Sequence, residues 1–261
     1  MIIDFHTHAF PDRIAEKAMN ALEEGCQTKG FHDGRLQSLL DSMDQAGIEK
    51  SVICNIATKP DQFLPILNWS QEIAGSRIIP FASVHPDDPD MDKHIDMVAD
   101  AGLKGIKMHP YYQKYILDEK RLFPIYQKIQ EAGLIFVSHT GFDIAFPRQR
   151  VADPEKIINV INEFPDLKFI TTHLGSWQDW DEVEKHLVGK PIYIEISFSL
   201  NLLNQQQAKR ILTNHPAEYL LFGTDSPWTD QVQAVYLLKQ LGLNQDLLEK
   251  IFFMNAQRLL K

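Results

Sequence analysis

Short apolar runs that alternate with longer helical patterns constrain the fold of this 261-residue chain more than any other feature. The runs are almost continuously apolar, which is typical of parallel strands buried on both faces. The segments between them carry helix signals, such as Asp153 and Pro154 before a stripe of apolar residues at helical spacing. We expect eight strands, at residues Ile2–Phe5, Ser51–Ile56, Ile78–Val84, Gly105–Met108, Leu134–Ser138, Lys168–Thr172, Ile192–Ile196 and Tyr219–Gly223.

Strands that alternate with helices predict βαβ units and a parallel sheet. Eight such units favour a closed (β/α)8 TIM barrel, formed as one domain over residues 1–261. The first interval is longer than the others, and we expect an added helix and loop within Pro11–Leu36. A doubly wound sheet is the alternative, but no Gly-x-Gly-x-x-Gly sequence follows any of the strands, which weakens it.

Composition excludes several classes of function. With 44% hydrophobic and 23% charged residues, the chain can bury a core and is not disordered. Its net charge of −9 argues against binding to nucleic acid or to an anionic membrane surface. No apolar run approaches the roughly 18 residues of a membrane span. The N-terminus shows no secretory signal, and the two cysteines, Cys26 and Cys54, form no disulfide framework, so we expect a cytoplasmic protein.

Polar side chains gather at the carboxyl ends of the expected strands, where the active sites of (β/α)8 barrels lie. His6 and His8 end the first strand, and their spacing of two places both on one face. His139 and His173 end the fifth and sixth strands, each with a glycine two positions later, and Asp225 ends the eighth. Neutral imidazoles and a carboxylate suit Zn²⁺, Fe²⁺ or Mn²⁺, so this pattern predicts a divalent metal site.

Barrel closure is required for the first and eighth strands to share a metal. Neighbouring strands lie about 4.8 Å apart, so in an open sheet these two would be more than about 30 Å apart. In a closed barrel they are adjacent. We therefore predict that His6, His8, His139 and Asp225 converge on one divalent metal ion.

Three features together resemble the amidohydrolase superfamily of metal-dependent hydrolases. They are Asp4-x-His6-x-His8, the histidines that end the fifth and sixth strands, and Gly-Thr-Asp-Ser-Pro at residues 223–227. The compact chain and the segment Asp4–Pro11 are similar to the branch called amidohydrolase family 2. The resemblance implies a (β/α)8 barrel with a divalent metal at its mouth.

Carried over to this sequence, the resemblance implies that His6, His8 and His139 bind the metal. It also implies that Asp225 binds the metal or its water and carries protons. His173 would bind a second metal in two-metal members, or polarise the substrate in one-metal members.

Lys107 ends the fourth strand in a setting similar to that of a lysine in superfamily members such as dihydroorotase. Those enzymes use the lysine, carbamylated, to bridge two metals. The same branch includes one-metal decarboxylases, some of which lack this lysine, and a substrate-facing ammonium is the alternative role for Lys107. We expect one or two ions, with Zn²⁺ as the metal.

Six further residues near strand ends are candidates for contact with a small-molecule substrate: His85, His109, Arg148, Arg150, Trp177 and Trp228. Each of the two histidines precedes a proline, and loop anchoring is the other interpretation. The two arginines could pair with a substrate carboxylate, unless they are solvated surface residues. The two tryptophans lie just past the sixth and eighth strands, where packing between helices is the alternative.

Hydrolysis of a small amide, lactone or ester-like compound is the first function that these residues support. A metal would activate a water molecule, and Asp225 would accept its proton and pass it to the leaving group. Non-oxidative decarboxylation of a small carboxylic acid at one metal is the second. A metal-binding or ligand-sensing barrel without turnover is the third. The oligomeric state stays open, and a homodimer is compatible with the sequence.

Overall fold

The computed structural model describes residues 1–261, and its eight strands lie in two hydrogen-bonded arcs of parallel strands. The first arc has the order β1-β2-β3, and the second has the order β4-β5-β6-β7-β8. All eight predicted runs overlap these strands. They are β1 (Ile3–Thr7), β2 (Lys50–Cys54), β3 (Ile78–Phe81), β4 (Gly105–Met108), β5 (Ile135–Ser138), β6 (Lys168–Thr171), β7 (Tyr193–Glu195) and β8 (Leu220–Leu221).

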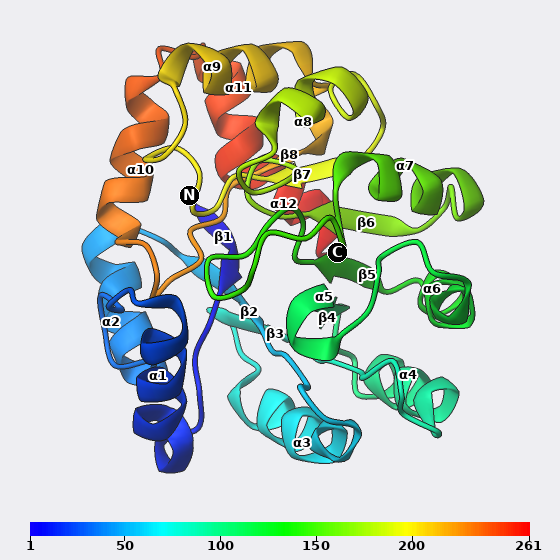
Figure 1. The fold of residues 1–261 in the computed structure, drawn as a ribbon. Coiled ribbons are helices and arrows are strands. Elements are labelled where there is room, and N and C mark those ends of the chain that lie inside the picture. The colour runs from blue at the N-terminus through cyan, green and yellow to red at the C-terminus, as the bar shows by residue number, and fades with distance from the viewer.

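The two arcs meet along both of their edges (Figure 1). Just past β3, the amide of Ala82 donates to the carbonyl of Gly105 at 3.0 Å, and the amide of Lys107 donates to the carbonyl of Ala82 at 2.8 Å. Between β1 and β8, the amide of Phe5 donates to the carbonyl of Phe222 at 2.8 Å. The strands therefore form the predicted (β/α)8 TIM barrel rather than an open, doubly wound sheet.

Helices surround the strands in a ring (Figure 1). They are α1 (Asp12–Cys26), α2 (Leu36–Ala46), α3 (Phe63–Ile73), α4 (Met91–Asp100), α5 (Pro110–Gln113), α6 (Phe123–Glu131), α7 (Pro154–Glu163), α8 (Trp180–His186), α9 (Gln205–Asn214), α10 (Gln231–Gln240), α11 (Gln245–Glu249) and α12 (Asn255–Leu259). Short 3₁₀ turns are η1 (Pro60–Gln62), η2 (Lys120–Leu122) and η3 (Ala217–Tyr219), and η4 (Lys250–Met254) is a π-helical turn. None of these helices combines the length and the apolar character needed to cross a lipid bilayer.

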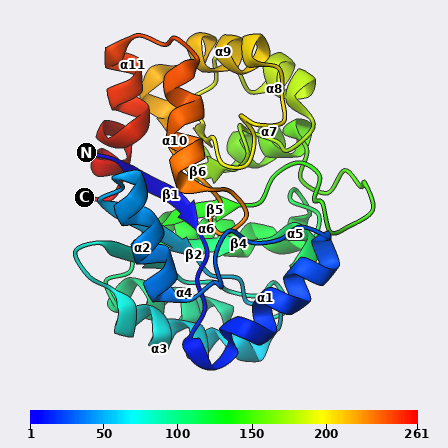
Figure 2. The same cartoon turned by 90° about the vertical axis from the view of Figure 1, so that its left-hand side faces the viewer.

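The added segment of the first βα unit forms α1 and a loop, as its length predicts. Helix α2 packs against α10, whereas α1 is inclined to α2 (Figure 2). The side chain of Met19 packs closely against the loop that follows α1. Its atoms would lie within 2.8 Å of a Cβ atom placed on Gly30 or on Gly34. Glycine at these two positions therefore lets α1 approach the loop closely.

Asp4 joins the first and last strands of the barrel. Its carboxylate accepts hydrogen bonds from the amide of Thr224 at 3.0 Å and from the side chain of Gln231 at 2.7 Å. It also accepts from the amide of His6 at 3.1 Å, where the pairing of β1 with β2 shifts register. Burial raises the pKa of Asp4 to about 7. Asp4 thus fixes the end of β1, from which His6 and His8 extend.

Candidate metal centre and cavity

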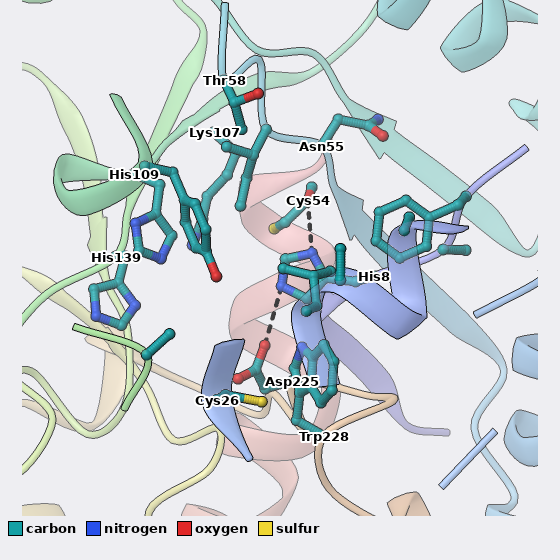
Figure 3. A pocket seen from close by; sticks show the side chains of 18 of the residues that line it. His8, Cys26, Cys54, Asn55, Thr58, Lys107, His109, His139, Asp225 and Trp228 are labelled. Carbon is teal, nitrogen blue, oxygen red and sulfur yellow. Dashed lines mark hydrogen bonds and ion pairs between the residues drawn. The ribbon is translucent and has the colours of Figure 1, made fainter. Parts of the chain in front are cut away.

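A cavity of about 510 Å³ lies among residues that follow the strand ends (Figure 3). Nine of the twelve predicted site residues line it: His6, His8, Lys107, His109, His139, His173, Trp177, Asp225 and Trp228. We use the name floor for the six of them that were predicted as metal ligands: His6, His8, Lys107, His139, His173 and Asp225. His85, Arg148 and Arg150 do not line the cavity.

Three candidate ligand atoms in the floor lie within 3.5 Å of one another. Nε2 of His6 and Nε2 of His8 are 3.2 Å apart. Oδ1 of Asp225 lies 3.0 Å from Nε2 of His8 and 3.5 Å from Nε2 of His6. The closed barrel makes this possible, since Asp225 follows β8 and the two histidines end β1.

The hydrogen bonds behind the two imidazoles identify these three atoms as acceptors. Nδ1 of His8 lies 2.8 Å from the carbonyl oxygen of Cys54, which can only accept, so Nδ1 carries the hydrogen (Figure 3). Nδ1 of His6 lies 3.0 Å from Oε1 of Glu195 and 3.1 Å from Oγ of Ser197. With the hydrogen of His6 also on Nδ1, both Nε2 atoms present lone pairs to each other and to a carboxylate. A cation bound between them would satisfy all three, so the donor set fits a divalent metal.

Glu195 was missing from the predicted site. It ends β7 and is fully buried, and its carboxylate accepts from the amide of His173 at 3.0 Å and from the amide of Ser197 at 2.7 Å. A Cβ on Gly223 would lie 2.2 Å from Oε2 of Glu195, so only glycine leaves room for this carboxylate. Burial raises the pKa of Glu195 to about 8. A charged residue at the end of an apolar run was the available signal.

His139 and His173 form a second pair of facing acceptors. Nδ1 of His139 and Nε2 of His173 are 3.0 Å apart. Their other ring nitrogens face backbone carbonyls, 2.9 Å from Phe142 and 3.2 Å from Ser197, and so carry the hydrogens. Burial lowers the pKa of both imidazoles and keeps them neutral. His139 therefore faces His173 and lies outside the group formed by His6, His8 and Asp225.

Lys107 is the one lysine in the floor. It is 1% exposed, and its Nζ lies 3.4 Å from Nε2 of His6. Burial lowers the pKa of Lys107, which favours the neutral amine. A neutral amine is the form that can react with carbon dioxide to give a carbamate.

A second carboxylate that the sequence did not reveal lies beside the floor. Oδ2 of Asp143 is 3.3 Å from Nε2 of His109 and 3.7 Å from Nε2 of His139, and the two imidazole rings stack 4.2 Å apart. Burial lowers the pKa of His109 to about 3. Burial alone would raise the pKa of Asp143, but its contacts with His109 and His139 hold it below its usual range. Asp143 lies in a loop, so no strand pattern marks it.

Three of the predicted substrate contacts, His85, Arg148 and Arg150, do not line the cavity. Arg150 pairs with Asp179 at 3.0 Å and is half exposed. Arg148 lies over the ring of Phe142, 3.8 Å from its centre, and donates to Oε1 of Gln178 at 2.7 Å. Nδ1 of His85 accepts from the amide two residues later at 3.1 Å, which anchors the loop after β3. Each of these side chains has a structural partner outside the cavity.

The backbone is strained at two of the floor residues. His173 has a φ of 59° and Asp225 a φ of 63°, values that non-glycine residues adopt rarely. Such conformations cost about 1–3 kcal/mol each and are found mainly where a functional side chain must be aimed. Here they follow β6 and β8 and turn both side chains into the cavity.

Comparison with known proteins gives a family and a fold. The family model "Amidohydro_2: Amidohydrolase" matches residues 3–261. The search of curated proteins gave no match. An uncharacterized TIM-barrel protein from Bordetella bronchiseptica is 19% identical, with a TM-score of 0.80 and coverage of 99% of this chain and 98% of that one.

Two further solved structures have named activities. A probable 2-pyrone-4,6-dicarboxylic acid hydrolase from Acinetobacter baumannii, solved with citric acid, is 15% identical with a TM-score of 0.70, covering 99% and 98% of the chains. A 5-carboxyvanillate decarboxylase from Novosphingobium aromaticivorans, solved with manganese, is 13% identical with a TM-score of 0.73, covering 100% and 97%. At these identities the likeness shows the fold alone.

Proposed function

The chain belongs to the amidohydrolase family, whose members are metal-dependent enzymes, and we propose that it is a hydrolase of small amides, lactones or ester-like compounds. The observation that carries this proposal is the pair of acceptor groups in the floor. His6, His8 and Asp225 form one group, and His139 and His173 form the other. Two groups of unprotonated acceptors fit two cations better than one.

Lys107 is the residue we propose to link the two groups. Its lowered pKa and complete burial favour carbamylation, which would turn the amine into an anionic group with two oxygens. When bound, divalent ions lower the pKa of a water molecule and polarise a carbonyl group. We expect Zn²⁺ as the metal, in a single domain of residues 1–261 that acts in the cytoplasm.

Asp225 is the proposed proton carrier. Its Oδ1 faces both imidazoles of the first group, and its side chain borders the cavity. A carboxylate in this position can accept a proton during attack on the substrate and deliver it to the leaving group. Glu195 and the carbonyl of Cys54 hold His6 and His8 in orientation, and the carbonyl keeps Nε2 of His8 unprotonated.

Decarboxylation of a small carboxylic acid is the second candidate, and it depends on the same lysine. As an ammonium, Lys107 would bind a substrate carboxylate and exclude a second metal. Arg148 and Arg150, the other predicted partners of such a carboxylate, do not line the cavity. The geometry therefore favours hydrolysis.

Metal analysis of protein purified with zinc and bicarbonate tests the proposal. We expect about two equivalents, about one in Lys107→Ala, and loss of ester or amide hydrolysis in that variant. Lys104→Ala, at an exposed position on the same segment, is the matched control. One equivalent that Lys107→Ala leaves unchanged, together with release of carbon dioxide from aromatic acids, would establish decarboxylation instead. Protein without stoichiometric metal would refute both reactions.

A further inference from the structure

One side of the cavity is formed by apolar side chains from two helices. Ala18 and Leu22 of α1 and Ile66 and Trp69 of α3 line the same cavity as the floor, and all four are partly buried. We use the name wall for these four residues. They lie away from the strand ends, so the wall is separate from the groups that would hold the metal.

Helix α1 turns a continuous apolar face toward the cavity. Ile14, Ala18, Ala21 and Leu22 recur at helical spacing and all line the cavity, and Ile14 is 43% exposed at its rim. The anchor of the helix is Met19, which is buried against the following loop. Ala18 and Leu22 on the face toward the cavity are only partly buried, so part of this apolar surface is free to contact a ligand.

Positive charge is scarce in the cavity. Lys107 and Arg13 are the only lysine and arginine that line it. Lys107 lies in the floor beside His6, and Arg13 is exposed on α1. Asp143 and Asp225 add negative charge to the lining. A carboxylate placed along the wall would lose its water without gaining a buried cation, which is costly.

We propose that the substrate carries a neutral, apolar arm on its hydrolysable carbonyl group, with the carbonyl at the floor and the arm along the wall. This inference rests on the proposed hydrolysis. The cavity of about 510 Å³ is large enough for a ligand with an arm of this kind. Burial of each methylene against Leu22, Ile66 or Trp69 strengthens binding, whereas a carboxylate at the same place weakens it.

Hydroxamic acids separate the arm from the reaction, because they bind metals and need no turnover. We would titrate the zinc-loaded enzyme calorimetrically with acetohydroxamic acid, hexanohydroxamic acid and the monohydroxamic acid of adipic acid. We expect the hexanoyl compound to bind at least about tenfold more tightly than the acetyl compound. The adipic compound, which ends in a carboxylate, should lose this gain. Equal affinity for all three would overturn the inference.

Two substitutions locate the arm. Leu22→Asp should abolish the gain from the longer chain and leave the affinity for acetohydroxamic acid unchanged. Asn20→Asp adds the same charge to α1 at an exposed position outside the cavity and should keep the gain. Ile66→Asp, with exposed Asn68→Asp as its control, repeats the test on α3 and remains informative if α1 does not tolerate the first change.

The outcomes distinguish the inference from the proposed function. Failure of acetohydroxamic acid to bind refutes the metal centre and with it the hydrolase. A chain-length gain without hydrolysis of any ester or amide keeps the apolar arm and refutes the reaction. If Leu22→Asp instead converts a dimer to a monomer by size-exclusion chromatography and leaves the gain intact, the wall binds a second copy of the chain and the inference is wrong.

Discussion

In the floor of the cavity the imidazoles have hydrogen-bond partners behind them, whereas the wall contacts its surroundings through apolar packing alone. His6 is held by Glu195 and Ser197 at 3.0 and 3.1 Å, and His8 is held by a carbonyl at 2.8 Å. Leu22 and Ile66 are partly buried apolar side chains on two helices. The floor residues lie in the strands of the barrel or shortly after their ends, and half of the wall belongs to the added helix α1.

This difference separates two kinds of sensitivity. A reaction depends on atoms held within a fraction of an ångström, so a change at the floor should cost orders of magnitude in rate. Apolar contact has no fixed direction and scales with area, so a change at the wall should alter affinity for the arm in graded steps. The barrel can thus keep its chemistry while the added helix α1 determines which substrates bind.

The largest effect is expected at Asp225. Asp225→Asn should keep the fold and most of the metal but lower kcat/KM about 10²- to 10⁴-fold, because an amide cannot accept a proton near neutral pH. Steady-state kinetics on any substrate identified, with metal analysis and thermal melting alongside, measures this. Asp230→Asn in the same loop is the control, since asparagine also caps a helix and α10 needs this cap. Turnover close to wild type would show that Asp225 does not carry the proton.

A smaller effect is expected at Glu195, which contacts His6 of the floor. Glu195→Gln keeps the size of the side chain but places an amide where the carboxylate accepts from Ser197 and His173. We expect metal affinity to fall about 10- to 100-fold while kcat at saturating metal changes less. Competition with a chelator measures the affinity, and exposed Glu218→Gln is the control. An unchanged dissociation constant for the metal would mean that Glu195 does not position His6.

The barrel and most of the floor could be predicted because they depend on local pattern. Burial on both faces makes each strand apolar, and His6, His8 and Asp225 stand out where those apolar runs stop. Glu195, near the end of Ile192–Ile196, meets the same criterion but was not among the predicted site residues. The structure adds the carbonyl and carboxylate partners, which no spacing in the sequence encodes.

The remaining parts of the site depend on contacts between segments far apart in the chain. His139 faces His173 because the backbone of His173 takes a left-handed conformation, which periodicity does not reveal. Asp143 reaches His109 from a loop. The period of α1 indicates an apolar face, but only the tertiary structure shows that this face lines the cavity. Sequence pattern describes elements, and their mutual orientation comes from tertiary packing.

The smallest effect is expected at Arg150, outside both regions. Arg150 is half exposed and pairs with Asp179, so Arg150→Ala should change kcat/KM less than about twofold and stability by less than about 1 kcal/mol. Kinetics on substrates with and without a carboxylate measures this, with Arg13→Ala at the cavity rim as the comparison variant. A tenfold rise in KM confined to the carboxylate-bearing substrate would mean that the loop after β5 closes over the cavity and brings a cation to the wall. The contrast between a polar floor and an apolar wall would then fail, and decarboxylation of an acid would become the better account of the site.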